Sequence, residues 1–311
     1  MATTLFRSSG DVTADRRYSF ASEFATRGDY AAAADLLAQT VELAPGFTAA
    51  WFALGEAHER LGRKFDAIAA FQEVLTRDSG DPYGASLRLA RLGATATREM
   101  PANYVREVFD QYANRFDDAL TRGLSYKGPE LLFDAAREAC DASGQDFHFR
   151  FMLDLGCGTG LGAVPFRPFI DQLAGVDLSP NMVELARGKK IYDRLAVGDI
   201  MAFLGSEAAG TQQLVLAADV FAYFADLAPV ISACVHVLAP AGLLAFTVET
   251  HAGDGIILGD KLRYAHGAAH VRTVCGRAGL RVMLLNEAST RNEAGVPVPG
   301  LVVAAQRPDK S

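Results

Sequence analysis

The sequence predicts an α/β fold with a sheet of mainly parallel strands, preceded by an all-α domain. Three observations support this prediction. Residues 151–160 read as a short buried strand that breaks into a glycine-rich turn, two further apolar runs end in an aspartate, and residues 17–78 repeat weakly at a period of 34. Strand-and-turn units at regular spacing are typical of parallel sheets, whereas a 34-residue period is typical of paired helices. We therefore expect two domains, residues 1–98 and residues 99–311.

The glycine turn directly follows the first predicted strand. Residues 151–155 form the apolar run FMLDL, which is long enough for a buried strand and too short for a helix. Gly156, Gly158 and Gly160 follow at once. Glycine reaches positive φ without a steric penalty and has no Cβ to keep a ligand away from the backbone. A strand, such a turn and then a helix would place free backbone N–H groups and a helix N-terminus at one point, which suits a nucleotide-like cofactor.

Two aspartates mark the next two apolar runs. Residues 173–177 (LAGVD) end in Asp177, 23 residues after Asp154, and residues 195–200 (LAVGDI) carry Asp199, another 22 residues on. An acid at the tip of the second strand can hold a ribose diol through paired hydrogen bonds. The spacing predicts successive strand–helix units whose carboxyl ends line one crevice.

These segments resemble the class I S-adenosylmethionine (SAM)-dependent methyltransferases. The resemblance lies in DLGCGTG at residues 154–160, GVDLS at residues 175–179 and GDI at residues 198–200, and it extends over about residues 101–311. It implies a Rossmann-like seven-stranded methyltransferase sheet with SAM as the cofactor. It also implies that the glycine loop packs under the methionine part of SAM, that Asp177 takes the ribose hydroxyls and that Asp199 faces the adenine amino group. The cofactor-binding residues expected from the resemblance in these segments are Asp154, Gly156, Cys157, Gly158, Gly160, Asp177, Leu178, Asp199 and Ile200.

An NAD-dependent oxidoreductase is the alternative interpretation of the glycine turn. The dinucleotide fingerprint has glycines at its first, third and sixth positions, but the sixth position counted from Gly156 is Leu161. This alternative also gives no role to Asp154, inside the first strand, or to Asp199. The methyltransferase interpretation is therefore preferred.

Composition and charge indicate a cytoplasmic protein that acts on something other than nucleic acid. Hydrophobic residues make up 50% and charged residues 22% of the chain, which is typical of soluble globular proteins. The N-terminus has no apolar signal region, and no run approaches membrane-spanning length. The net charge of −7 argues against a nucleic-acid substrate, because phosphate neutralisation needs clustered Lys and Arg. The four cysteines are dispersed in apolar settings, so we expect buried free thiols and no metal site.

The N-terminal repeat resembles the tetratricopeptide repeat. The resemblance lies in WFALG at residues 51–55 and in Ala33, which recurs as Ala67. Small residues at these positions would let paired helices approach closely. We expect a third helix at about residues 82–93 to cap the array. Two roles stay open: the helices either pack on the enzyme or on a sister subunit, or they hold a partner protein. The oligomeric state is open as well.

Two helices are expected to cover the cofactor. Residues 104–117 place apolar residues at helical spacing and resemble the helix with the pattern FDxYAxxFD that precedes many small-molecule methyltransferase domains. On this helix Tyr112 is the candidate for contacting the methionine end, with a role in the core as the alternative. Ser179 and Pro180 would open the next helix as its cap and its first residue. Met182 on that helix is expected to close over the adenosine.

The methyl acceptor is expected beyond the fourth and fifth strands, at residues 213–219 and 243–250. Ala218, at the end of the fourth strand, is counted with the cofactor-binding residues. Methyl transfer from a sulfonium is an in-line displacement, so the main task of the protein is to align acceptor and methyl group. Oxygen and nitrogen acceptors can also need a base within hydrogen-bond reach. His266 beside Tyr264 is the preferred pair, since a neutral imidazole is the usual base near pH 7, and Asp219 is a third candidate.

The residues after the fourth strand narrow the choice of acceptor. Enzymes that methylate amino groups of nucleic-acid bases or glutamine amides carry Asn/Asp-Pro-Pro-Tyr/Phe at this place, where residues 217–220 read AADV. A small molecule or a protein is therefore the expected acceptor. As a whole the chain resembles a bacterial group of tetratricopeptide-repeat methyltransferases, which implies the reaction but no particular acceptor. A non-catalytic SAM-binding or scaffolding module is the alternative.

Overall fold

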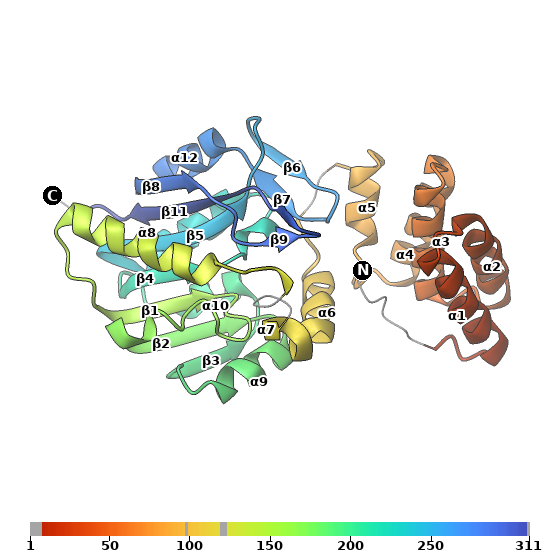
Figure 1. Cartoon of the computed structure of the whole chain (residues 1–311), viewed down its shortest axis with the longest axis horizontal. Helices are drawn as coiled ribbons and strands as arrows, with labels where there is room; N and C mark the ends of the chain where they lie inside the picture. Colours follow the sequence, from red (N-terminus) through yellow and green to blue (C-terminus); the bar gives the residue numbers. More distant parts are fainter. Residues whose placement is uncertain (1–7, 97–98, 119–122, 310–311) are drawn as a thin grey trace. The chain divides into compact units, whose positions relative to one another are not determined.

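The computed structural model describes residues 8–96, 99–118 and 123–309. The chain divides into two compact units, Met1–Val108 and Phe109–Ser311, whose elements are labelled in Figure 1. The division falls inside helix α6 (Ala102–Tyr112). None of the described helices is long and apolar enough to cross a membrane.

The first unit is a short array of antiparallel helices. Ala33 and Ala67 are fully buried at the interfaces of paired helices, as expected of small residues there. Gly55 has the same role, because a Cβ at this position would lie 2.6 Å from the ring of Phe71. The two predicted helix pairs and the predicted third helix are confirmed. The helices are α1 (Val12–Thr26), α2 (Tyr30–Leu43), α3 (Thr48–Arg60), α4 (Lys64–Arg77) and α5 (Ala85–Arg91).

The second unit is built on one mixed sheet, which has nine strands within the described residues. Seven of them follow the order β3-β2-β1-β4-β5-β11-β8, in which the first five are parallel and β11 is antiparallel to both β5 and β8. The predicted seven-stranded sheet of mainly parallel strands is confirmed. These strands are β1 (Phe149–Leu155), β2 (Ile170–Asp177), β3 (Arg194–Val197), β4 (Gln212–Ala217), β5 (Leu238–Glu249), β8 (Arg281–Glu287) and β11 (Gly300–Gln306).

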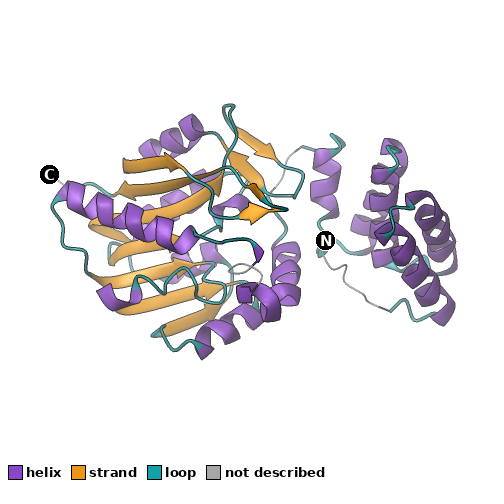
Figure 2. Cartoon of the chain, in the orientation of Figure 1, coloured by secondary structure: helices purple, strands orange, loops and turns teal. Residues whose placement is uncertain are grey.

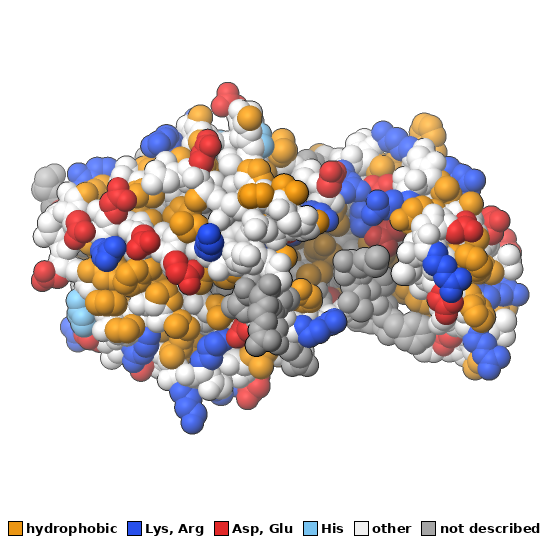
Figure 3. Space-filling model, in the orientation of Figure 1, with side chains coloured by type: hydrophobic (Ala, Val, Ile, Leu, Met, Phe, Trp, Pro, Cys, Tyr) orange, Lys and Arg blue, Asp and Glu red, His pale blue; other side chains and the backbone are white. Residues whose placement is uncertain are grey.

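Helices cover both faces of this sheet (Figure 2). Alternation along the strands sends Met152 to one face and Leu153 to the other, which gives each face its own apolar core. The first core is closed by α8 (Gly128–Ser143). The second is closed by α10 (Ile200–Ser206), α11 (Leu227–Val237) and α12 (Ala268–Arg277). On the face shown in Figure 3, acidic and basic side chains are interspersed over this unit.

One predicted connection differs from the structure. The helix expected directly after the glycine loop is absent from this described stretch, where residues 161–166 form turns followed by the short 3₁₀ helix η3 (Arg167–Phe169). The prediction was wrong because Pro165 and Pro168 each remove a backbone donor and restrict the residue before them, so a helix cannot propagate through the segment. The long connection after β5 forms a hairpin of two strands, β6 (Ile256–Leu258) and β7 (Tyr264–His266). Strand β7 also pairs with the end of β5.

Candidate functional site

The glycine loop follows β1 at the carboxyl edge of the sheet. Gly156, Gly158 and Gly160 have φ values of +61°, +52° and +91°, in the region that other residues rarely adopt. A Cβ at Gly156 would lie 2.5 Å from the side chain of Val220, and one at Gly160 would lie 2.9 Å from the ring of Tyr192. The loop therefore needs glycine both for its conformation and for its close packing.

Asp177, at the end of β2, is tied directly to this loop. The Gly158 N–H donates to its Oδ2 at 2.9 Å, and the Ser179 N–H donates to its Oδ1 at 2.8 Å. Burial raises the pKa of Asp177, and these backbone hydrogen bonds oppose that rise by favouring the carboxylate. Ser179 also caps α9 (Pro180–Gly188) by accepting from the Met182 N–H, so the cap predicted at this position is confirmed.

Asp154, inside β1, is buried beneath the loop. Burial raises the pKa of its carboxyl to about 7, and the Tyr192 hydroxyl donates to its Oδ2 at 2.5 Å. The Tyr192 ring fills the space beside Gly160 and Gly175. Sequence reasoning missed Tyr192, because it lies in the connection before β3 and belongs to none of the motifs quoted above.

The remaining expected cofactor residues border the same edge. Asp199 is exposed and caps α10, its Oδ1 accepting from the N–H groups of Met201 and Ala202. Leu178 and Ala218 are half-buried, whereas Ile200 and Met182 are buried. Cys157 is a buried free thiol, as expected, and so are the other three cysteines. Burial raises the pKa of the Cys157 thiol well above its usual value, so the sulfur stays protonated near pH 7.

The end of α6 and the residues that follow it lie against the glycine loop and α9. Asp110 accepts hydrogen bonds from the side chains of Ser179 and, through its backbone oxygen, Asn181. Asp117 accepts from the Thr159 hydroxyl and from Lys189 Nζ. These contacts fix the segment that was predicted to cover the cofactor.

Four aromatic rings continue from this segment to the acceptor side. A Cβ at Gly158 would lie 3.7 Å from Phe116. Phe116 packs edge-on against Tyr112 and Phe109, and Phe109 packs edge-on against Tyr223 with ring centroids 5.5 Å apart. Tyr112 is 37% exposed, so it is not a core residue in this structure.

Of the three candidate bases, Asp219 follows β4, and Tyr264 and His266 are the first and last residues of β7. His266 is fully buried, and burial lowers its pKa to about 4, so the imidazole is neutral near pH 7. Its Nε2 lies 3.1 Å from the Phe224 oxygen, and its Nδ1 has no partner among the described residues. Tyr264 is fully buried beside it in β7. The Asp219 carboxylate is held by the hydroxyls of Thr247 and Thr290.

An ionic ring that the sequence did not reveal lies next to Asp219. Glu249 Oε1 accepts from both Arg263 and Arg291, and Glu293 Oε1 accepts from the same two guanidinium groups. Arg291 Nη1 also lies 3.4 Å from Asp219 Oδ2. Burial lowers the pKa of Arg291, but the carboxylates of Asp219 and Glu249 outweigh burial and hold that pKa above its ordinary value.

We call these four residues, Glu249, Arg263, Arg291 and Glu293, the ionic ring. Its members come from the end of β5, from the residue before β7 and from the segment around β9 (Asn292–Glu293). Because these three segments are separate in the sequence, only the fold brings the four side chains together.

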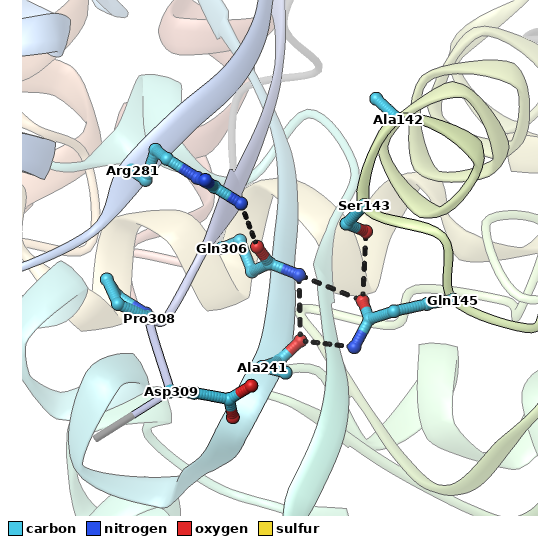
Figure 4. Close-up of a pocket in the computed structure, with 8 residues that line it drawn as sticks. All are labelled: Ala142, Ser143, Gln145, Ala241, Arg281, Gln306, Pro308 and Asp309. Atoms are coloured by element: carbon cyan, nitrogen blue, oxygen red, sulfur yellow. Dashed lines mark hydrogen bonds between the residues drawn. The ribbon is translucent and has the colours of Figure 1, made fainter. Parts of the chain in front are cut away.

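A separate depression lies at the opposite edge of the sheet (Figure 4). Gln306 is at its centre, accepts from Arg281 at 2.7 Å and donates to Gln145 Oε1 at 2.9 Å. Its donors and acceptors are thus satisfied within the protein, and the depression is remote from the glycine loop. We do not assign the chemistry to it.

Each unit contains a segment that matches a known protein family. A family described as a methyltransferase domain matches residues 153–246, and the tetratricopeptide repeat family matches residues 18–82. The chain is 32% identical over 153 residues to human methyltransferase-like protein 27, and this match covers 47% of the chain and 58% of that protein. The chain thus spans less than two thirds of the length of the curated relatives it matches.

Two solved structures share the fold at low sequence identity. One is the 1,6-didemethyltoxoflavin-N1-methyltransferase of Burkholderia thailandensis with bound S-adenosylhomocysteine, with a TM-score of 0.52 and 15% identity over 69% of this chain and 93% of that chain. The other is the [4+2]-cyclase SpnF, with a TM-score of 0.54 and 15% identity over 70% of this chain and all of that chain (100%). The name of the second protein illustrates that the fold alone does not define the chemistry.

Residues 153–246 thus match a methyltransferase domain, residues 18–82 match tetratricopeptide repeats, and the second unit shares its fold with a methyltransferase that was solved with S-adenosylhomocysteine.

Proposed function

We propose that this protein transfers the methyl group of SAM to a small-molecule or protein acceptor. The observation that carries the proposal is the cradle formed by the glycine loop and Asp177. Gly156 and Gly160 leave no room for a side chain, and Gly158 donates its N–H to Asp177, the acid that is proposed to hold the ribose. This combination exposes backbone to a ligand on one side while it packs tightly on the other.

The residues present fit SAM. Each oxygen of Asp177 accepts one backbone N–H and keeps a lone pair with which it can accept from a ribose hydroxyl. Asp199 uses Oδ1 as a helix cap, and its second oxygen is proposed to face the adenine amino group. When bound, SAM supplies a methyl group that is attached to a sulfonium. The leaving group is a neutral thioether, so its departure needs no acid catalyst. The contribution of the protein is then to hold and align the reactants.

The acceptor is proposed to lie on the side of β4, β5 and β7. Of the three candidate bases, His266 carries a neutral imidazole whose Nδ1 has no partner among the described residues, and this is the atom that an acceptor proton would have to reach. Tyr264 is proposed to flank it. Asp219 is the candidate whose carboxylate already has partners, in Thr247, Thr290 and Arg291.

The oxidoreductase alternative is disfavoured by the connection between β1 and β2. A dinucleotide site places the pyrophosphate at the N-terminus of the helix that follows the glycine turn. Residues 161–169, all of which are described, contain turns and one 3₁₀ helix there but no α-helix. The anion-binding feature of that family is thus missing.

Calorimetry with SAM and S-adenosylhomocysteine tests the proposed cofactor site. We expect micromolar-range binding to the wild-type protein, and Asp177→Ala should weaken it about 100-fold, because losing hydrogen bonds to a charged group costs ~2–3 kcal/mol. Asp171→Ala is the matched control, since Asp171 lies at the opposite end of the same strand and is exposed. Tight binding of NAD with none of SAM would overturn the proposal.

A second experiment separates an enzyme from a SAM-binding module. SAM carrying a labelled methyl group is incubated with the protein and an extract from cells that lack it, and the products are sorted by size. Label in a small-molecule pool or in one protein band identifies the acceptor class. No label in either fraction, with SAM binding intact, would favour the non-catalytic module.

We propose domain bounds of residues 1–98 and 99–311. The repeats of the first domain are proposed to position a protein partner. Large apolar side chains on the repeat unit are exposed, with Phe65 84% and Phe20 56% accessible. Phe65→Ser and Phe20→Ser should leave SAM affinity unchanged and reduce methylation only if the labelled acceptor is a protein. Equal loss with a small-molecule acceptor would contradict a partner role.

A further inference from the structure

The ionic ring is shielded from solvent, so its balance of charge matters. The side chain of Arg291 is 8% exposed, and those of Glu249 and Arg263 are 16% and 18% exposed. Together with Asp219 the cluster holds three carboxylates and two guanidinium groups. Removal of Arg291 would leave three partly buried carboxylates with only Arg263 between them, a strongly unfavourable arrangement.

Asp219 is the member whose backbone is unusual. Its φ is +57°, in the left-handed region that an aspartate tolerates better than most residues but still adopts at a cost. Thr247 fixes this conformation, because its Oγ1 accepts from the Asp219 N–H at 2.8 Å and donates to Asp219 Oδ1 at 2.9 Å. Arg291 holds the other carboxylate oxygen.

The residues on either side of Asp219 form a wall of the cofactor loop. The Val220 side chain occupies the space in which Gly156 lacks a Cβ, with its Cγ2 2.5 Å from that position. On the other side, the Ala218 Cβ lies 3.3 Å from the position that a Cβ would take at Gly162. The turn centred on Asp219 therefore sets how the loop from Gly156 to Gly162 is packed.

We propose that Arg291 is a positioning residue for cofactor binding, which acts by holding the strained Asp219 turn and thereby pressing Val220 against Gly156. The inference rests on the proposed function, since it assumes that the glycine loop binds SAM. It assigns a role in cofactor binding to the segment around β9, which belongs neither to the glycine loop nor to the segments that carry Asp177 and Asp199. It also makes the acceptor side of the sheet a determinant of cofactor affinity.

The test measures the dissociation constant of S-adenosylhomocysteine by calorimetry for a set of folded variants. Arg291→Met should weaken binding about tenfold, since coupling through packed networks changes affinity by factors of this order. Arg291→Lys should recover part of that loss, because it keeps the charge but not the fork of donors. Arg194→Met is the control: Arg194 also pairs with a glutamate, Glu207, but lies at the far edge of the sheet in β3.

A double-mutant cycle distinguishes this route from general destabilisation. Val220→Ala removes the wedge against Gly156, so Arg291→Met should have less effect on affinity in that background than in the wild type. Additive effects would overturn the proposed route. Unchanged affinity in folded Arg291→Met would overturn the role altogether.

A second variant covers the case in which Arg291→Met does not fold. Thr247→Val removes both hydrogen bonds to Asp219 without leaving an unpaired charge, and it should weaken S-adenosylhomocysteine about fivefold. Wild-type affinity in Thr247→Val would then overturn the proposal. Failure of the wild-type protein to bind S-adenosylhomocysteine at all is a different result, which would sink the proposed function itself.

Discussion

The two halves of the carboxyl edge are built in different ways. On the cofactor side, at β1 and β2, the geometry comes largely from backbone groups, as in the hydrogen bond that the Gly158 N–H donates to Asp177. On the acceptor side, at β4, β5 and β7, it comes from pairs of charged side chains, as in the pairing of Glu249 with Arg263 and Arg291. A site built from the backbone of glycines tolerates almost no substitution. In a network of several side chains, the remaining contacts partly compensate for the loss of one.

The largest effect is expected on the cofactor side, from Gly160→Ala. Alanine at φ +91° is strained, and its Cβ would lie 2.9 Å from the Tyr192 ring, which itself is held by Asp154. Strain and overpacking together cost ~3 kcal/mol, so affinity for S-adenosylhomocysteine should fall about 100-fold. Calorimetry gives the measurement.

Gly205→Ala is the matched control for this substitution. Gly205 lies in α10, and nothing is within 4 Å of its Cβ position. Alanine there should leave affinity unchanged and raise stability by ~0.5–1 kcal/mol, since glycine is unfavourable within a helix. Equal affinity of the two variants would contradict the view that the loop backbone itself forms the cradle.

A second effect on the cofactor side depends on pH. The pKa of Asp154 is raised from 3.8 in the unfolded chain to about 7 in the folded protein, so the folded state retains a proton that the unfolded state releases. The free energy of unfolding therefore falls as pH rises through this range and levels off above it. Asp154→Asn keeps an acceptor for the Tyr192 hydroxyl and removes the ionisation.

As pH rises, the free energy of unfolding of Asp154→Asn should therefore increase relative to that of the wild type by ~1.4 kcal/mol per pH unit, or ~2 kcal/mol between pH 5.5 and pH 7. Urea unfolding of both proteins across this interval measures the difference. A constant difference at all pH values would show that Asp154 is ionised in the fold despite its burial.

The same contrast explains how much the sequence predicted. The parallel strands, the glycine loop, the acid at Asp177 and the cap at Ser179 were predicted from local patterns, whereas the seven-stranded sheet was implied by the resemblance to methyltransferases. A helix was wrongly predicted after the glycine loop, although Pro165 and Pro168 argue against one. The glycine motif was given more weight than the rule that proline interrupts helices. Tyr192 and Arg291 could not be predicted, since their roles depend on contacts with residues 38 and 42 positions away in the sequence.

The smallest effect is expected on the acceptor side, from Thr290→Val. The Thr290 hydroxyl donates to Asp219 Oδ1 at 3.0 Å, and valine has nearly the same shape without the donor. Loss of one hydrogen bond to a carboxylate should lower the free energy of unfolding by ~1 kcal/mol. Affinity for S-adenosylhomocysteine should stay within about twofold, because Thr247 still fixes the Asp219 backbone and Arg291 still holds its carboxylate. A loss of affinity as large as that of Thr247→Val would mean that the carboxylate contacts, rather than the hydrogen bond to the Asp219 N–H, set the turn. The network around Asp219 would then depend on each of its contacts rather than share them.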